Sequence, residues 1–410
     1  MNIMFLAMSY APEEVSGAVL VAELAEDLVK RGHNVTVVAP APNYPYGRIF
    51  AGYKNWLYRV EFIRGVRVIR TWSYISPQKT FWRRLFFYGT FSTTAFYGAL
   101  FAGRPELLVA YLPPLPLGLT AWLLSILGRL PWILQIEDLY PDAAIAAGIL
   151  TNKKVINFFL WLEKFLYQKV SKISVIANSF RKVILTKGIS DTKIEVIPVW
   201  ADPDQVQPMA KNNAFRAANS IEDEFVVLYA GNIGLTSCLE DVLHAADLLK
   251  DQAHIKFVIV GEGVKKEILQ TEARSKELTN IIFLPFQPRE QFAEMLAAAD
   301  LSLVTLNSNA AFSSLPSKIF NVMASARPIL AISPRESEIA SIVQKVGCGV
   351  NIDPGSPEKL AETIVRLKMC DHLLSQMGQI SRLYLETHYS RSFCVDSHER
   401  LYLKLLEQTN

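Results

Sequence analysis

Short, nearly uncharged apolar runs recur along the chain, and segments with a helical spacing of leucines separate them. The segment Ser16–Arg31, for example, places Leu20, Leu24 and Leu28 on one helical face. Runs that are apolar at consecutive positions are typical of parallel strands, because both faces of such a sheet are buried. The pattern therefore predicts an α/β fold with helices packed on parallel strands. The predicted strands of the first half are Asn2–Met8, Asn34–Ala39, Val60–Ile63, Val66–Thr71, Leu107–Tyr111, Trp132–Ile136, Ile173–Ala177 and Lys193–Ile197.

The alternation of strands and helices is interrupted between Trp200 and Glu224, where Asp, Asn and Pro predict a linker. Helices are predicted again from Ser356 to the end of the chain. A chain of 410 residues exceeds the usual size of a single core. We therefore predict two domains, 1–200 and 221–390. The predicted strands of the second domain are Phe225–Ala230, Lys256–Val260, Asn280–Leu284, Ser302–Thr305 and Ile329–Ile332.

Composition narrows the function classes without choosing among them. Half of the residues are hydrophobic and the formal net charge is only +3, so nothing favours a nucleic-acid partner. The four cysteines are scattered without the spacing of metal ligands, which is typical of a protein in a reducing compartment. Met1–Met8 is apolar but lacks the basic start of a signal peptide.

The segment 79–104 has the composition of a membrane-surface helix. It begins with Lys79, Trp82, Arg83 and Arg84 and continues with many Phe and Tyr residues. Its serines, threonines and glycines make it a poor spanning helix, although Leu85–Ala102 is uncharged and nearly long enough. We predict contact with a membrane surface, and the alternative is a buried helix of the α/β domain.

The stretch from Ser313 to Pro328 holds the strongest candidate for an anion site. Pro316 and Ser317 are good helix-start residues, and Lys318 adds a full positive charge where helix N–H groups favour an anion. Glycine loops follow two strands of the same half and could cradle a nucleotide diphosphate with backbone N–H groups. The predicted donor and phosphate residues are Gly231, Asn232, Gly234, Gly261, Gly263, Ser313, Ser314, Leu315, Pro316, Ser317, Lys318 and Asn321.

Carboxylates follow the strand Trp132–Ile136 in the first half. Glu137 and Asp138 stand directly at its carboxyl end, where they could bind hydroxyls or act as a base, whereas Asp142 is predicted to cap the next helix. The turn Ser16-Gly17 follows the first strand and is predicted to face the same substrate. The triplet Asp202-Pro203-Asp204 resembles a DxD metal motif, but its position in the predicted linker argues against a metal there.

Five motifs together resemble glycosyltransferase family 4, in the right order and over nearly the whole chain. With Gln135-Ile136-Glu137-Asp138, the Pro-Ser-Lys motif is similar to the subgroup that builds colanic acid and other bacterial exopolysaccharides, and to transferases of N-acetylfucosamine to O-antigen. The five motifs are Arg31-Gly32-His33-Asn34-Val35, Tyr229-Ala230-Gly231-Asn232, Gly261-Glu262-Gly263, Pro316-Ser317-Lys318 and Ala324-Ser325-Ala326-Arg327-Pro328.

The resemblance implies a GT-B fold, in which two Rossmann-like domains face each other across a cleft. It also implies retaining transfer from a nucleotide-diphosphate sugar, such as a UDP- or GDP-sugar, without a metal or an external cofactor. The donor would lie on 221–390 and the acceptor on 1–200, and the last helix, 391–410, would pack back on the first domain. We expect a lipid-linked saccharide acceptor at the cytoplasmic face of the membrane, with Asp138 and Glu137 as catalytic residues.

Some family positions differ here. Where many members carry two glutamates, this chain has Ser313 and Asn321. The usual Arg and Lys of the C-terminal glycine loop are replaced by Asn232 and Ser237, and a common His is replaced by Glu137. These differences leave Lys318 as the main charge for the diphosphate. Two alternatives stay open from sequence: a sugar-nucleotide 2-epimerase of the same fold, and a catalytically inactive GT-B-like partner in a polysaccharide complex.

Overall fold

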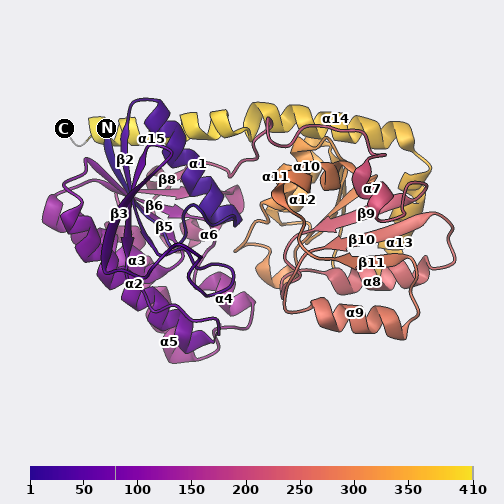
Figure 1. Cartoon of the computed structure of the whole chain (residues 1–410), viewed down its shortest axis with the longest axis horizontal. Helices are drawn as coiled ribbons and strands as arrows, with labels where there is room; N and C mark the ends of the chain where they lie inside the picture. Colours follow the sequence, from indigo (N-terminus) through magenta and orange to yellow (C-terminus); the bar gives the residue numbers. More distant parts are fainter. Residues whose placement is uncertain (79, 409–410) are drawn as a thin grey trace. The chain divides into compact units, whose positions relative to one another are not determined.

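The computed structural model describes residues 1–78 and 80–408. Within them the chain forms two compact units, each built around its own sheet (Figure 1). The first unit comprises Met1–Pro198 together with the residues from Cys394 onward, and the second comprises Val199–Phe393. Lys79, the first residue of the predicted membrane-surface segment, lies outside the described residues, as do positions 409 and 410 of the predicted last helix, 391–410.

The sheet of the first unit has the order β3-β4-β2-β1-β5-β6-β7-β8 in the described residues. All neighbouring strands are parallel except the hairpin of β3 and β4. In its centre β1 pairs with both β2 and β5, so that Ile3 lies between Val35 and Leu107. The strands are β1 (Asn2–Leu6), β2 (Asn34–Pro40), β3 (Tyr58–Ile63), β4 (Val66–Thr71), β5 (Leu107–Leu112), β6 (Trp132–Ile136), β7 (Lys172–Val175) and β8 (Ile194–Val196).

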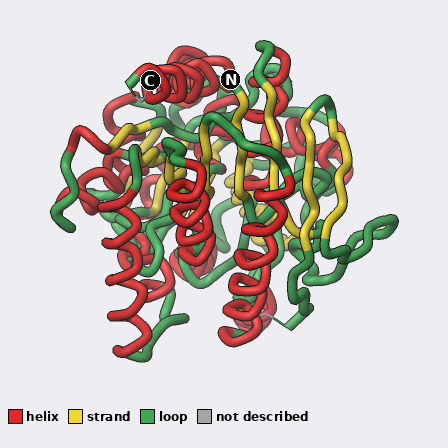
Figure 2. Tube along the Cα trace, turned by 90° about the vertical axis from the view of Figure 1, so that its left-hand side faces the viewer, coloured by secondary structure: helices red, strands yellow, loops and turns green. Residues whose placement is uncertain are grey.

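Helices pack along this sheet, and Figure 2 shows them running beside the strands. Helices α2 and α3 contact each other, and α3 contacts α5. The helices are α1 (Ser16–Lys30), α2 (Phe81–Phe101), α3 (Leu115–Gly128), α4 (Asp142–Ala146), α5 (Lys153–Lys169), α6 (Asn178–Thr186) and α15 (Arg391–Glu407), with a 3₁₀ turn, η1 (Asp191–Lys193).

The second unit carries a parallel sheet with the order β11-β10-β9-β12-β13-β14. Its strands are β9 (Phe225–Ala230), β10 (Ile255–Val260), β11 (Ile281–Leu284), β12 (Leu301–Thr305), β13 (Ile329–Ile332) and β14 (Gly349–Ile352). Its helices are α7 (Ala214–Ala218), α8 (Leu239–Leu248), α9 (Lys266–Ser275), α10 (Arg289–Ala297), α11 (Lys318–Ala324), α12 (Glu338–Val346), α13 (Pro357–Lys368) and α14 (Asp371–His388), with a 3₁₀ turn, η2 (Ser308–Ala310).

Both strand orders reverse direction at one point, between β1 and β5 in the first sheet and between β9 and β12 in the second. On either side of such a point the connecting loops leave in opposite directions, which opens a crevice at the carboxyl ends of the strands. A ligand of either unit is therefore expected near its reversal point.

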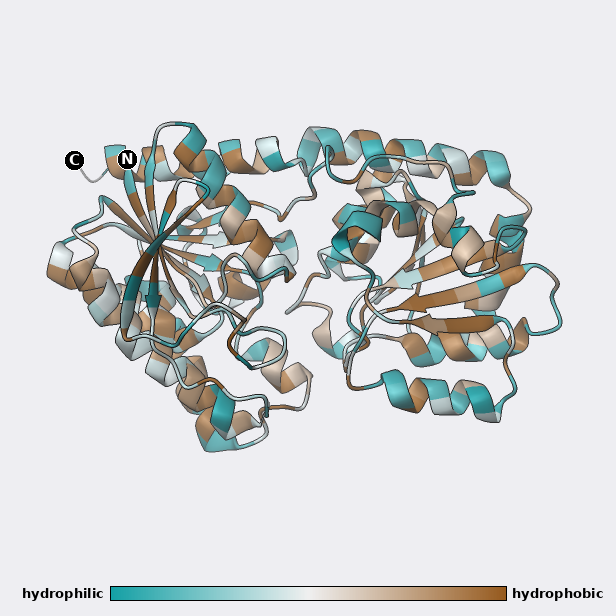
Figure 3. Cartoon of the chain, viewed as in Figure 1, coloured by the Kyte–Doolittle hydropathy of each residue, from teal (hydrophilic) through white to brown (hydrophobic). Residues whose placement is uncertain are grey.

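Hydrophobic packing holds each unit together. Figure 3 shows apolar residues along the strands of both sheets, whereas the helices alternate between polar and apolar positions. The central strands are buried along their whole length, and in the second unit Val227, Phe257 and Leu303 belong to one core cluster. Consecutive apolar positions along a strand thus predicted burial on both faces correctly.

The C-terminal helix α15 packs on the first unit. Tyr402 lies edge-on to Phe5 of β1, with ring centroids 6.5 Å apart. At the turn after α1, Arg31 forms a 2.6 Å ion pair with Glu399, and His33 Nε2 lies 2.6 Å from the same carboxylate. His33 therefore has a structural partner in the fold.

The structure differs from the sequence-based prediction at three places. The predicted linker contains the helix α7, in which Phe215 and Arg216 are buried. A strand that we did not predict, β14, completes the second sheet. Asp142 begins α4 without capping it, because its carboxylate pairs with Lys187 instead.

Candidate functional site

Lys318 reaches from α11 to the glycine loop that follows β9. Its ammonium nitrogen lies 3.7 Å from the centroid of the Tyr229 ring, at the end of β9. A Cβ atom added to Gly231 would stand 2.5 Å from this nitrogen, so the end of the lysine lies directly against this residue, whose φ of 148° favours glycine. The fold therefore brings two predicted donor motifs together at the reversal point between β9 and β12.

The glycine loops after β9 and β10 pack backbone against backbone. A Cβ on Gly261 would lie 1.9 Å from the carbonyl oxygen of Gly231, and one on Gly263 would lie 2.2 Å from that of Ile233. Both glycines have positive φ angles, 151° and 156°, that side chains disfavour. Glycine is therefore required here by the contact between the two loops themselves.

This packing uses some of the N–H groups that the sequence offered to a phosphate. Gly231 donates to Val260, Ile233 to Glu262 and Gly261 to Leu284, with distances between 2.8 and 3.0 Å. Within the described ranges, the hydrogen bonds leave the N–H groups of Gly234 and Gly263 without a backbone acceptor. The backbone cradle for a diphosphate is thus smaller than the loop sequences suggested.

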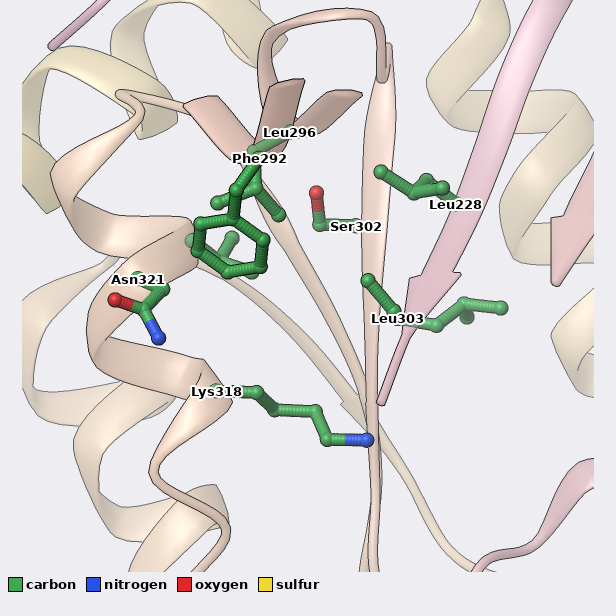
Figure 4. Close-up of a pocket in the computed structure, with 9 residues that line it drawn as sticks. Leu228, Phe292, Leu296, Ser302, Leu303, Lys318 and Asn321 are labelled. Carbon is green, nitrogen blue, oxygen red and sulfur yellow. The ribbon is translucent and has the colours of Figure 1, made fainter. Parts of the chain in front are cut away.

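The Lys318 side chain passes among mainly apolar side chains. Burial lowers the pKa of its ammonium group from 10.5 to about 7. Figure 4 shows the chain of Lys318 passing below an apolar hollow that Phe292, Leu303 and Asn321 help to line. Because burial disfavours the charged ammonium group, an anionic ligand beside it would restore the interaction that water no longer provides.

The remaining residues of the predicted donor stretch lie around the start of α11. Ser313 is buried and its hydroxyl has no hydrogen-bond partner in the described structure. Leu315 is buried, whereas Ser314, Pro316 and Ser317 are partly exposed. Asn321 follows Lys318 by one helical turn (Figure 4), and the side chain of Asn232 folds over Gly234.

In the first unit, Glu137 meets the start of α1. The backbone N–H of Glu137 donates to Leu112 at 3.0 Å, which fixes the residue directly beyond β6. Its carboxylate oxygen Oε2 lies 3.1 Å from where a Cβ atom on Gly17 would stand. Asp138 is partly exposed beside it, and Ser16 begins the same helix. The predicted residues of the first half therefore gather at the carboxyl edge of its sheet.

Burial raises the pKa of the Glu137 carboxyl from 4.5 to about 7, and the charge of Asp138 adds to this effect. Near neutral pH the Glu137 carboxyl can therefore carry a proton, which it could donate in a hydrogen bond to a sugar hydroxyl.

The raised pKa predicts a pH-dependent stability difference for Glu137→Gln. Below about pH 4.5 the carboxyl is protonated in the folded and unfolded states, so the variant and the parent should be equally stable. As pH rises through 7, the parent loses up to about 3 kcal/mol because it must ionise a buried carboxyl. Urea unfolding at pH 5 and pH 8 measures this, and a difference that does not change with pH would contradict it.

Asp142 belongs to a partly buried ion network with Lys187 and Glu163. The Lys187 ammonium contacts Asp142 at 2.5 Å and both oxygens of Glu163 at 2.7 Å. The network joins α4 to α5 and to the residue that ends α6, and so fixes the chain segment that follows Asp138. Asp142 is therefore a structural residue in this fold.

Sequence reasoning missed Tyr229, on whose ring the Lys318 ammonium lies. Tyr229 begins the motif that ends with Gly231-Asn232, which could have indicated a role, but only the fold shows that its ring contacts the lysine.

Among the described residues, no group of three or more His, Cys, Asp or Glu side chains could hold a metal ion. None of the helices in the same ranges is both long enough and apolar enough to cross a bilayer.

Two family models match the chain, one over each half. Residues 17–200 match the glycosyl transferase 4-like domain, and residues 210–384 match glycosyl transferases group 1. A putative colanic acid biosynthesis glycosyl transferase, WcaI of Escherichia coli (strain K12), is 27% identical over 396 residues, which cover 94% of this chain and 96% of WcaI.

Solved structures show the same fold at low sequence identity. Sucrose-phosphate synthase from Thermosynechococcus elongatus is 17% identical and superposes with a TM-score of 0.76, covering 99% of both chains. Anabaena Alr3699/HepE, solved in complex with UDP-glucose, is 14% identical with a TM-score of 0.73, covering 98% of this chain and 100% of that chain. The predicted GT-B fold class, with two parallel sheets, is confirmed.

Proposed function

Because the chain belongs to the glycosyltransferases that join a 4-like domain to a group 1 domain, we propose that it transfers a sugar from a nucleotide-diphosphate sugar to a lipid-linked glycan. The similarity to a colanic acid transferase supports a place in bacterial surface polysaccharide biosynthesis. We propose a retaining mechanism that needs neither a metal nor an external cofactor, as the family resemblance implies.

The convergence of Lys318 and the glycine loop at Gly231 carries this proposal. The pair lies at the reversal point of the second sheet, where open α/β sheets bind ligands. A lysine with a lowered pKa and an aromatic contact gains most from a diphosphate, because the anion replaces the hydration that burial removed. HepE, a protein of the same fold, binds UDP-glucose, which supports a nucleotide sugar as donor.

In this proposal the two units divide the reaction between them. The second unit holds the donor diphosphate, and Lys318 stabilises the charge that develops on the leaving phosphate. Asp138 and Glu137 of the first unit bind the reacting hydroxyls, and Ser16 with Gly17 lets the acceptor approach them. Front-face attack, with the leaving phosphate taking the acceptor proton, would retain the anomeric configuration.

An exposed aromatic stripe on α2 supports contact with a membrane. Trp82, Phe86, Tyr97 and Phe101 recur at intervals that fall on one helical face, and each is more than half exposed. Exposed apolar side chains on the neighbouring helices extend this surface: Leu123, Ile126 and Leu127 on α3, and Phe158 and Trp161 on α5. Such a patch on a lipid-modifying enzyme fits the acyl boundary of the bilayer.

We predict that anionic liposomes bind the protein and that Arg83→Glu with Arg84→Glu weakens this binding. A basic residue near an anionic surface contributes about 1 kcal/mol, and each charge reversal removes the attraction and adds repulsion, so roughly 30-fold or more should be lost. Cosedimentation with anionic and neutral vesicles measures the effect. Phe312→Ala, at an exposed position of the second unit, is the control, and equal binding to both vesicle types would contradict the prediction.

A thermal-shift screen with UDP, GDP, dTDP and ADP tests the proposed function. A nucleoside diphosphate at about 100 times its Kd adds about 2.7 kcal/mol to the stability of the protein that binds it. We expect one of the four to raise the melting temperature. A melting temperature that none of them changes would favour the inactive GT-B-like partner over an enzyme.

A further inference from the structure

A loop of the first unit presents two tyrosines at the carboxyl edge of its sheet. The loop follows β2 and carries Tyr44 and Tyr46, whose side chains are 49% and 71% exposed. The carboxyl end of every parallel strand in this sheet meets the same edge, so the loop shares this edge with Glu137 and Asp138. None of the residues assigned to the reaction above belongs to this loop.

A buried carboxylate fixes the conformation of the loop. Glu13 is only 3% exposed, and its Oε1 accepts hydrogen bonds from the backbone N–H groups of Asn43 at 2.6 Å and Tyr44 at 2.8 Å. The loop also closes on itself, because the N–H of Gly47 donates to the carbonyl of Asn43 at 2.8 Å. A Cβ on Gly47 would lie 2.3 Å from the Ser76 carbonyl oxygen, so the loop is pressed against its neighbour.

A buried arginine anchors the base of the same loop. The Arg70 guanidinium, 2% exposed, donates to the carbonyl of Pro40 at 3.1 Å and to that of Ala11, and pairs with Glu61 at 2.7 Å. The Tyr53 ring, at the far end of the loop, lies 5.7 Å from it. Ordering a loop in advance lowers the entropy that a ligand must overcome. Both anchors therefore prepare Tyr44 and Tyr46 for a binding partner.

The tyrosines lie some distance from the reacting carboxylates. Strand β2 is three strand spacings from β6, roughly 14 Å at 4.7–4.9 Å each. Tyr140 follows Asp138 by two residues and is partly exposed, so a further aromatic side chain stands close to the carboxylates in the sequence.

We propose that Tyr44 and Tyr46 form an acceptor subsite that stacks on a sugar ring of the acceptor glycan other than the ring that reacts. One face of a pyranose presents C–H groups that fit the negative face of an aromatic ring, and its hydroxyls can bond the tyrosine hydroxyls at the edge. The inference rests on the proposed function, because it takes a glycan as the acceptor. It adds that the enzyme selects acceptors longer than one sugar.

The test is saturation-transfer NMR with the methyl glycosides of glucose, galactose, mannose and fucose at millimolar concentration, in the presence of UDP. We expect at least one glycoside to receive saturation at its ring C–H protons. In Tyr44→Ala with Tyr46→Ala, its affinity should fall at least about fivefold, since one aromatic pair corresponds to roughly 2- to 13-fold. Phe62→Ala, at a 72% exposed aromatic of β3, should bind like the parent.

Substitution of Glu13 tests the anchoring. Glu13→Gln keeps an oxygen for the two N–H groups and should bind the glycoside like the parent. Glu13→Ala should lose affinity for the glycoside, and its Asn43 and Tyr44 amide hydrogens should exchange faster.

Equal binding by the parent and the double tyrosine variant, or no saturation of any glycoside, would overturn the subsite. A double tyrosine variant that lost liposome binding but kept glycoside binding would also overturn it. The thermal shift by a nucleoside diphosphate should persist in the double variant, so failure of the proposed function would show separately, in the parent.

Discussion

Lys318→Met should weaken the binding of the nucleoside diphosphate by roughly 10- to 150-fold, the equivalent of one hydrogen bond to a charged group. The substitution keeps an unbranched apolar side chain and removes the ammonium group that lies against Gly231 and the Tyr229 ring. The nucleoside without phosphates should bind the parent and the variant equally. Turnover should fall further than donor affinity does, because the leaving phosphate gains charge in the transition state.

The same substitution should stabilise the protein without ligand. Lowering the Lys318 pKa from 10.5 to about 7 corresponds to roughly 5 kcal/mol. Below pH 7 the parent bears the whole cost, since the ammonium is charged in both states. Between pH 7 and 10.5 the folded lysine is neutral while the unfolded one is charged, so stability rises with pH and the advantage of the methionine, about 5 kcal/mol, disappears.

Calorimetric titration and urea unfolding measure these opposite effects. Lys266→Met is the matched control, because Lys266 also lies beside a glycine loop but its ammonium pairs with Glu262 at 2.6 Å. It should leave diphosphate affinity unchanged. An unchanged affinity in Lys318→Met would make Lys318 an ordinary helix residue and move the phosphate site to the Gly231–Gly234 loop.

Asp138→Asn should lower turnover by about 100-fold or more, because the carboxylate orients the reacting hydroxyl and a misplaced reacting group costs about 100-fold in rate. The amide keeps the size of the side chain but loses the negative charge beside Glu137, so the pKa of Glu137 should fall in the variant. Diphosphate affinity should not change, because Asp138 belongs to the other unit. Steady-state kinetics and a diphosphate titration test both expectations.

Asp142→Asn is the control for this prediction. Asp142 lies four residues further along the chain and pairs with Lys187. We assign it no catalytic role. We expect turnover within a few fold of the parent. If Asp138→Asn retained near-normal turnover in a folded protein while Asp142→Asn lost it, the catalytic role of Asp138 would be wrong.

Much of the fold follows from the sequence because parallel strands are buried on both faces. The run Trp132–Ile136 is apolar apart from Gln135, and it was predicted with the bounds that the structure has. The short helix α7 could not be predicted, because asparagines surround it and because the charge of Arg216 finds its carboxylate partner far away in the chain. Its guanidinium donates to the carbonyl of Ala298 and pairs with Asp300 at 2.5 Å. Such long-range pairing has no local signature.

The same limit applies to the site. Composition and spacing placed Lys318 and the glycine loops among the candidates, but the contact between Lys318 and Gly231 joins residues far apart in the sequence. The loop sequences also suggested more free N–H groups than the structure leaves, since Gly231 and Gly261 donate to neighbouring strands. Glu13 carried no motif at all, and only the fold shows that it holds the backbone of Tyr44.

Transfer of a labelled sugar into a lipid fraction tests the central claim most directly. The protein is incubated with lipid-linked saccharides from bacterial membranes and with UDP- or GDP-sugars labelled in the sugar. We predict that label from at least one donor enters the lipid extract with the anomeric configuration of the donor retained, and that Asp138→Asn slows this transfer by about 100-fold or more. Recovery of the label only as an altered sugar nucleotide, with none in the lipid extract, would contradict the account and favour the 2-epimerase.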